Sequence, residues 1–309
     1  MTSTALAALP EGLTSRPLQL SDARAVYEVM AADQVDQLGH AEIEEADIVG
    51  DWARPSFDVA ASTMGVFDGD QLVGYAEVTA ADRGDAAVHP EYRGRGIGTA
   101  LAHWMQDRAR ENGQGIIGMP VPEGSHGDRL LAALGYRVRW TSWVLKLPEG
   151  VEVTERPLPD GYAVRAATEE EYPACHAVIE DAFLEWSVRD RERYEDFHAS
   201  VVGRPGFEPW NLRVVTDGAG DVVGCGLVNL AESEDDRPAE AFISRLAVRR
   251  DQRNRGLAQV LLVDAFAVAR EHGAGVSGLS TDSRTGALGL YEKVGMVTTD
   301  VWVNRAKDL

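Results

Sequence analysis

The spacing of hydrophobic and polar positions predicts the same order of helices and strands twice along the chain. In the first half, helical spacing alternates with short runs that read as strands, two of which flank a tight Asp68-Gly69 turn. The predicted segments are a helix (22–30), three strands (64–67, 72–78, 86–89), a helix (99–111), a strand (115–119), a helix (128–134) and a strand (141–147).

The second half repeats this order. Its predicted segments are a helix (169–183), three strands (212–216, 222–230, 241–248), a helix (257–271), a strand (275–281), a helix (287–294) and a strand (300–304). In each half several antiparallel strands precede the long central helix, which predicts an α/β (α+β) unit. A linker rich in proline, glycine and charge, residues 148–161, separates the halves and predicts domains at 1–150 and 151–309.

The two halves also share a motif. Arg93-Gly94-Arg95-Gly96-Ile97-Gly98 matches Arg253-Asn254-Arg255-Gly256-Leu257-Ala258 at an offset of 160 residues, and Leu134-Gly135-Tyr136 matches Val294-Gly295-Met296 at the same offset. The Asp-Gly turns at Asp68 and Asp217 are offset by only 149 residues. The second copy is therefore expected to carry extra residues around 232–238.

The net charge of the chain limits which kinds of molecule it is expected to bind. The chain of 309 residues has 30 Lys and Arg against 50 Asp and Glu, a formal charge of −20. Such a surface repels phosphate backbones and anionic lipid heads, so neither nucleic acid nor a membrane is an expected partner. Acidity favours cationic small molecules such as amines, although it equally serves solubility.

The sequence shows neither a targeting segment nor the residue spacing of a metal site. The first residues have no basic start followed by an apolar run, and no window reaches the length of a membrane span, so a cytoplasmic protein is expected. The two cysteines, Cys175 and Cys225, read as small buried apolar residues. The histidines and cysteines show no metal-site spacing, so no metal is predicted.

The two glycine loops have the sequence pattern of an anion-binding site. A strand, a bend with small residues and a helix together direct backbone N–H groups and a positive helix end at one point, which forms a seat for an anion such as a diphosphate. A Rossmann site would place the loop after the first strand of a βαβ unit, and a P-loop would contain Gly-Lys-Ser/Thr. Neither condition holds, which leaves a different phosphate seat or a plain strand-to-helix turn.

These two loops resemble the signature of the GNAT family of acetyl-CoA-dependent N-acetyltransferases, a strand, Q/R-x-x-G-x-G/A and a helix. The segment from Leu290 through Tyr291 to Met296 also resembles a later segment of that family. The resemblance implies a mixed, largely antiparallel, splayed sheet in each of two tandem domains, with acetyl-CoA between the fourth and fifth strands. The cofactor-binding residues that it implies are Val88, Arg93, Gly94, Arg95, Gly96, Ile97, Gly98 and Thr99 in the first copy and Leu246, Ala247, Val248, Arg253, Asn254, Arg255, Gly256, Leu257 and Ala258 in the second.

Within the family, the tandem arrangement and the run 205–210 resemble the actinobacterial mycothiol synthase branch. Two features depart from that branch: residues 241–248 lack a Val-Gly-Val-Asp-Pro run, and Arg284 stands where an Asn is often found. Both a mycothiol precursor amine and another small amine therefore remain open as acceptors.

The copies differ at one position that matters chemically. Tyr291 lies 160 residues after Leu131, so only the second copy has a phenol in the place where GNAT enzymes often protonate the departing thiolate. By the same resemblance the amine attacks the thioester directly, strand N–H groups near residues 246–248 stabilise the oxyanion, and an acid acting through water removes a proton. Candidates for that acid are Glu240, Glu185 and Asp181.

Aromatic residues near the expected acceptor site, namely Phe183, Trp186, Phe207 and Trp210, form a lid or simply pack. The resulting prediction is an N-acetyltransferase acting on a primary amine of a small molecule, with chemistry in the second domain and a non-catalytic first domain. The alternative is a non-catalytic CoA-binding sensor or scaffold. A monomer or homodimer is expected, since two fused copies can replace the pairing of single-domain relatives.

Overall fold

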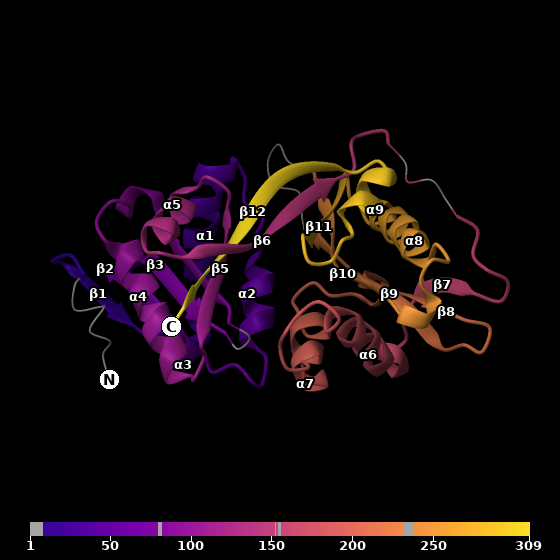
Figure 1. Cartoon of the computed structure of the whole chain (residues 1–309), viewed down its shortest axis with the longest axis horizontal. Coiled ribbons are helices and arrows are strands. Elements are labelled where there is room, and N and C mark those ends of the chain that lie inside the picture. The colour runs from indigo at the N-terminus through magenta and orange to yellow at the C-terminus, as the bar shows by residue number, and fades with distance from the viewer. Residues whose placement is uncertain (1–8, 80–81, 152, 154–155, 232–237) are drawn as a thin grey trace. The chain divides into compact units, whose positions relative to one another are not determined.

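The computed structural model describes residues 9–79, 82–151, 153, 156–231 and 238–309 (Figure 1). The chain forms two compact units. The N-terminal unit comprises Met1–Thr141, His198–Pro205 and Val301–Leu309, and the C-terminal unit comprises Ser142–Phe197 and Gly206–Asp300. The extra segment expected around residues 232–238 lies outside the described residues, except for Pro238.

The N-terminal unit is built on an antiparallel sheet of order β1-β2-β3-β4. A fifth strand, β5, touches this sheet through one parallel bridge, Arg83 to Gly118, and otherwise diverges from β4. The strands are β1 (Leu13–Arg16), β2 (Thr63–Asp68), β3 (Gln71–Val78), β4 (Gly84–Val88) and β5 (Ile116–Pro122).

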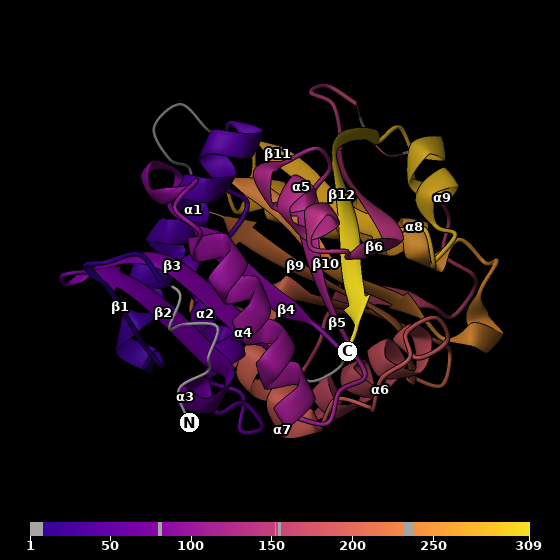
Figure 2. The same cartoon turned by 60° about the vertical axis from the view of Figure 1, so that its left-hand side comes forward.

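Helices cover both faces of this sheet, and the register shift of β3 against β2 places Val73 as an extra residue between the two faces. Val73 and Ala76 of β3 pack in one apolar cluster with the long helix α4, which lies across the strands in Figure 2. Leu72 and Tyr75 belong to a second cluster with α1. The helices are η2 (Leu20–Asp22), α1 (Ala23–Leu38), α2 (Glu45–Trp52), α3 (Val59–Ser62), η3 (Pro90–Tyr92), α4 (Ile97–Glu111), α5 (His126–Ala133) and η5 (His198–Val202).

The C-terminal unit has a mixed sheet. Strands β7 to β10 are antiparallel neighbours in sequence order, β11 joins β10 in parallel, and β6 joins β11 antiparallel. The strands are β6 (Arg137–Lys146), β7 (Ala163–Ala166), β8 (Leu212–Thr216), β9 (Val222–Ala231), β10 (Glu240–Val248) and β11 (Val276–Asp282). The predicted fold class, two tandem splayed sheets flanked by helices, is confirmed.

Two helices sandwich this sheet. The long helix α8 packs on β8, β9 and β10, and α6 packs on β9 and β10. Both cysteines are buried, and the Cys225 thiol lies 3.6 Å from the Cys175 carbonyl oxygen. The helices are η4 (Glu169–Glu171), α6 (Tyr172–Phe183), α7 (Tyr194–Phe197), η6 (Pro209–Asn211), η7 (Arg250–Gln252), α8 (Leu257–Glu271) and α9 (Leu288–Lys293).

The last strand of each sequence half completes the other unit. In the N-terminal unit, β12 (Val297–Asp308) pairs with β5 from Trp302 to Asp308, and Arg305 forms an ion pair with Asp128. In the C-terminal unit, residues 142–146 of β6 pair with β11. A single cut at residue 150 therefore does not separate the compact units, although it separates the sequence repeats.

Candidate active site

The C-terminal unit contains a cavity of about 810 Å³ where its sheet splays. Strands β10 and β11 pair from Glu240 to Ile243 and then diverge, so the rest of β10 has a partner only in β9. Leu246, Ala247 and Val248 line the cavity from this free edge. The volume falls within the range of ordinary small-molecule sites.

The predicted glycine loop lies at one end of this cavity. Asn254 and Gly256 both adopt left-handed backbone conformations, with φ of 64° and 81°, and Gly256 caps the start of α8. Asparagine tolerates this region, and glycine adopts it without strain. Among the described residues, the N–H groups of residues 254–258 donate no hydrogen bond. N–H groups of this kind at a helix start are suited to an anion, which agrees with what the motif predicts.

Arg253, the first arginine of the motif, is paired with a carboxylate. The Arg253 guanidinium donates two hydrogen bonds to Glu185, at 2.7 and 2.8 Å, and a longer one to the Val248 carbonyl oxygen. The hydrogen bonds from Arg253 hold the pKa of Glu185 below its usual value. Arg253 therefore ties the loop to the end of α6.

Tyr291, on α9, lines the same cavity and is only 8% exposed. Burial raises the pKa of its phenol to about 12. Its hydroxyl makes no hydrogen bond within the described part of the chain. A phenol in this state is protonated at neutral pH and can donate its hydrogen to a group in the cavity.

Strand β10 is irregular next to this cavity. Its pairing register with β9 shifts between Ile243 and Arg245, which marks a bulge at Ser244. Bulges re-aim backbone and side-chain groups and recur beside active sites. The equivalent strand of the N-terminal unit, β4, pairs with β3 without a shift.

The wall formed by β11 and the turn after it is polar. Ser280, Thr281 and Asp282 line it, and the Arg284 guanidinium donates from Nε to Asp282 at 3.1 Å. The same guanidinium lies over the Trp186 ring, 4.7 Å from its centroid. Sequence reasoning missed Asp282; its position at the end of a strand before a polar turn is the only signal that could have indicated it.

Two of the three predicted acids lie elsewhere. Glu240 does not line the cavity, because its carboxylate is held 2.7 Å from the Lys146 ammonium of β6. Asp181 forms an ion pair with Arg191 at the surface and does not line the cavity either. Glu185 does line it, in the ion pair with Arg253 already described.

The predicted aromatic lid divides into two pairs. Phe183 and Trp186 line the cavity with ring centroids 5.3 Å apart. Phe207 instead packs edge-on against Tyr172, and Trp210 stacks on His272 at 4.1 Å. Only the first pair therefore contacts the cavity.

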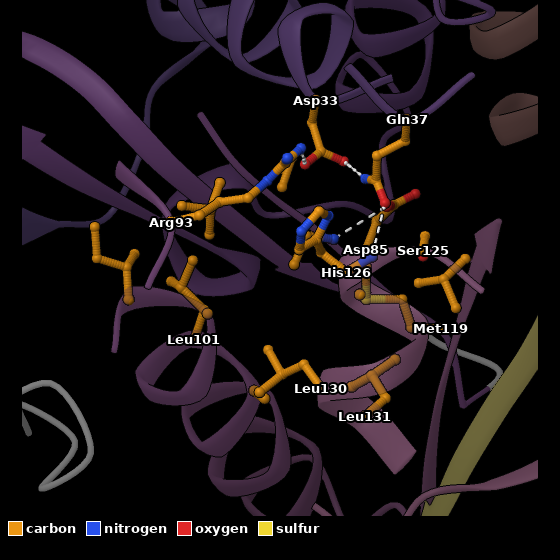
Figure 3. A pocket seen from close by; sticks show the side chains of 18 of the residues that line it. Asp33, Gln37, Asp85, Arg93, Leu101, Met119, Ser125, His126, Leu130 and Leu131 are labelled. Carbon is orange, nitrogen blue, oxygen red and sulfur yellow. Dashed lines mark hydrogen bonds and ion pairs between the residues drawn. The ribbon is translucent and has the colours of Figure 1, made fainter. Parts of the chain in front are cut away.

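The N-terminal unit has its own cavity, of about 420 Å³, in the matching place (Figure 3). It is lined by the loop from Arg93 to Thr99 (apart from Arg95), by Val88 and by Leu131, which is buried. Gly94 and Gly96 again have positive φ, and the N–H groups of residues 94–99 donate no hydrogen bond to any described residue. The loop geometry is thus repeated, whereas no phenol occupies the position of Tyr291.

Arg93 repeats the role of Arg253. Its guanidinium forms ion pairs with Asp33, at 2.7 Å, and with Asp36, both on α1. Asp33 also accepts a hydrogen bond from Gln37, whose side-chain oxygen accepts from the His126 N–H at 3.0 Å (Figure 3). Helix α1 is thereby fastened to the loop and to the start of α5.

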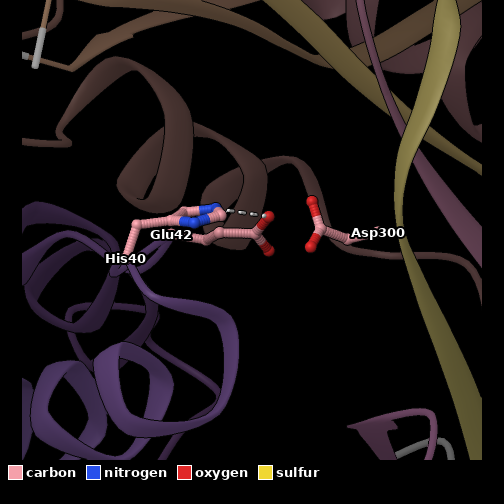
Figure 4. Close-up of side chains that lie close together, drawn as sticks. All are labelled: His40, Glu42 and Asp300. Carbon is pink, nitrogen blue, oxygen red and sulfur yellow. Dashed lines mark ion pairs between the residues drawn. The ribbon is translucent and has the colours of Figure 1, made fainter.

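One histidine of the N-terminal unit lies near a carboxylate. His40 Nε2 is 3.5 Å from Glu42 Oε1 (Figure 4), an ion pair only when the imidazole is protonated. Two ligand atoms are fewer than the protein ligands of a zinc site. Asp300, drawn in the same figure, belongs to the C-terminal unit and is not assigned to this pair.

Comparison with known proteins identifies the class. The family model described as "Acetyltransferase (GNAT) family" matches residues 24–136 and 167–296. The chain belongs to the GNAT family, and it is an N-acetyltransferase that uses a CoA thioester as cosubstrate and a small-molecule acceptor.

Individual relatives narrow the comparison. The chain is 30% identical over 318 aligned positions to a mycothiol acetyltransferase of Sanguibacter keddieii, covering 94% of this chain and 96% of the relative. It is also 30% identical to a mycothiol acetyltransferase of Salinispora tropica, covering 75% and 77%.

Solved structures support the same fold. A GCN5-related N-acetyltransferase from Sphaerobacter thermophilus matches with a TM-score of 0.72 at 24% identity, covering 97% of both chains. A tandem GNAT protein from the clavulanic acid biosynthesis pathway matches with a TM-score of 0.71 at 19% identity, covering 96% of this chain and 98% of the other. Among the described residues, no helix is both long enough and apolar enough to span a membrane.

Proposed function

We propose that the C-terminal unit transfers an acetyl group from acetyl-CoA to a primary amine, with Tyr291 as the acid. The observation that carries this proposal is the contrast between matched positions. Both cavities have the same loop with free N–H groups, but Tyr291 lines one of them and Leu131 the other. A leucine can only pack, whereas a phenol can protonate a departing thiolate.

The residues of the C-terminal cavity fit the cosubstrate. N–H groups of residues 254–258 suit a diphosphate, and the free edge of β10 beside Leu246, Ala247 and Val248 suits an extended amide chain. Acetyl-CoA supplies the acyl group, activated as a thioester. The bulge at Ser244 supports an oxyanion seat on this edge, because it interrupts the regular pairing of N–H groups.

Tyr291 is suited to hold a proton rather than to remove one. With its pKa raised to about 12 by burial, it is neutral throughout the range in which an amine becomes nucleophilic. Burial also excludes water, which strengthens a hydrogen bond from the phenol to a developing thiolate.

The proton of the incoming ammonium requires a base. Asp282 is buried, lines the cavity and is held by Arg284, so it can accept a proton directly or through water. Glu240 was predicted for this role, but it does not line the cavity, which favours a structural role. We therefore assign the base to Asp282.

The acceptor is proposed from the relatives. Those named mycothiol acetyltransferase cover most of this chain, which supports the amine precursor of mycothiol as the acceptor. The polar wall of Ser280, Thr281 and Thr285 suits an acceptor with several hydroxyl groups. Arg284 and the face of Trp186 set the shape of this wall.

The N-terminal unit is proposed to be non-catalytic. Its loop fits a diphosphate as well as the other loop does, but Leu131 offers no proton and β4 has no bulge. This unit therefore binds CoA without turnover or supports the fold. We propose that the chain acts in the cytoplasm.

The test is release of CoA thiol from acetyl-CoA in the presence of an amine panel that includes the mycothiol precursor. Release with that amine, and its loss in Tyr291→Phe, are the expected results. Binding of CoA to both loops with no thiol release for any amine would instead favour a CoA-binding sensor, the alternative that the degenerate N-terminal cavity supports.

A further inference from the structure

A linker arginine lies directly over the second glycine loop. A Cβ atom built on Gly256 would be 3.1 Å from Cδ of Arg156 and 3.8 Å from its Cβ. Arg156 also lines the cavity of the C-terminal unit, although most of its side chain is exposed. A residue that was predicted only as part of a linker thus lies beside the N–H groups of the anion seat.

Apolar contacts hold this stretch of linker in place on either side of Arg156. Val153 is buried in the apolar cluster that contains Tyr291. Leu158 packs against the cluster that contains Leu257, the first residue of α8. Both side chains are anchored on the C-terminal unit, which keeps the backbone of Arg156 near the loop.

Arg156 differs from the motif arginine in its partners among the described residues. Arg253 is neutralised by its two hydrogen bonds to Glu185. Arg156 makes no hydrogen bond or ion pair with any residue that the structure describes. A guanidinium without a carboxylate partner among the described residues, beside N–H groups at a helix start, is suited to a phosphate oxygen.

The N-terminal loop provides a built-in comparison. Gly96 occupies the position equivalent to Gly256, and no described atom outside its immediate neighbours lies within 4 Å of a Cβ built there. No described side chain therefore covers the N-terminal seat in the way that Arg156 covers the C-terminal one.

We propose that Arg156 binds the diphosphate of CoA in the C-terminal unit, together with the N–H groups of residues 254–258. The proposal rests on the proposed function, since it assumes that this loop seats the cosubstrate. It makes the linker part of one cofactor site and predicts that the two loops bind CoA with different dependence on charge.

Hydrogen–deuterium exchange with CoA titration tests this, because it follows the two glycine loops separately in the full-length protein. Arg156→Ala should raise the CoA concentration needed for half-protection of the loop at 253–258 about tenfold, the loss of one charge-assisted hydrogen bond. Protection of the loop at 93–98 should not change. Dephospho-CoA, which keeps the diphosphate, should show the same shift, and pantetheine, which lacks it, should show none.

Two variants complete the design. Arg156→Lys keeps a positive charge and should lose less than Arg156→Ala, whereas Arg270→Ala, an exposed arginine at the far end of α8, should change nothing. An unchanged titration of the 253–258 loop in Arg156→Ala would overturn the inference, as would a shift seen with CoA but not with dephospho-CoA. Failure of CoA to protect this loop in the unmodified protein would instead overturn the proposed function.

Discussion

The two cavities are made from equivalent elements and differ in the groups placed around the same loop. In both, a motif arginine is fastened to an acid at or near the end of the first helix, Arg93 to Asp33 and Arg253 to Glu185. The C-terminal cavity is the larger, about 810 against 420 Å³. It has Tyr291 where the N-terminal cavity has Leu131, and its strand β10 is bulged whereas β4 is not. Under the proposed function, the difference means that the motif provides the cofactor seat and that catalysis depends on the residues around it.

The sharpest way to break this comparison is Tyr291→Phe. Removing the phenol proton should lower kcat about 100-fold or more, with little change in the KM for acetyl-CoA, because the proton is needed chiefly in the transition state. Steady-state thiol release measures both constants.

The matched control is Tyr136→Phe, a buried tyrosine of the N-terminal unit whose hydroxyl lies 3.2 Å from Gln106 Nε2. It should leave kcat unchanged. An equal loss of kcat in both variants would remove the acid role of Tyr291.

The next largest effect is expected from substitution of the glycines that cap α4 and α8, and it concerns the KM for acetyl-CoA. Gly256→Val places a branched side chain at φ of 81° and against Arg156, so the KM for acetyl-CoA should rise about tenfold or more. The equivalent Gly96→Val carries similar backbone strain in the N-terminal unit and should leave turnover nearly intact. Loss of turnover in Gly96→Val, with the fold retained by circular dichroism, would show that catalysis needs both seats.

The two acids define a smaller contrast. Asp282→Asn should lower kcat/KM about tenfold, less than the roughly 100-fold at the lower end of the range for a proton-transferring group, because solvent water can accept the proton in its place. Glu240→Gln should leave kcat/KM within about twofold, because this carboxylate contacts Lys146 rather than the cavity. The reverse ranking would return the base to Glu240.

The smallest expected effect is on the pH dependence of kcat/KM. A tyrosine with the ordinary pKa of 10 would be half ionised at pH 10, and activity that depends on its proton would fall there. Because burial raises the pKa of Tyr291 to about 12, kcat/KM should rise as the amine deprotonates and stay level up to pH 10. A descending limb near pH 9 that disappears in Tyr291→Phe would contradict this.

The sequence predicted what depends on local pattern. The loops at 93–98 and 253–258, the helices that follow them and the order of the strands come from short-range spacing, and the structure has them. The four-residue strands β1 and β7 were missed, since so few residues carry too little alternation to detect.

The sequence could not predict what depends on distant contacts. Glu240 was chosen for its place at the start of a strand, but Lys146, ninety-four residues away, holds it outside the cavity. Arg156 and Asp282 reach the cavity only because a linker and a strand end are packed there by the whole unit. Neither has a spacing that marks it.

The reciprocal placement of β6 and β12 has a consequence for dividing the gene. A fragment ending near residue 150 would lack the strand that covers β5, and the complementary fragment would lack the strand that covers β11. Each half alone would expose an unpaired sheet edge, a known hazard for aggregation. Expressed together, the halves should complement one another, so the enzyme lends itself to a split reporter whose activity returns only on reassembly.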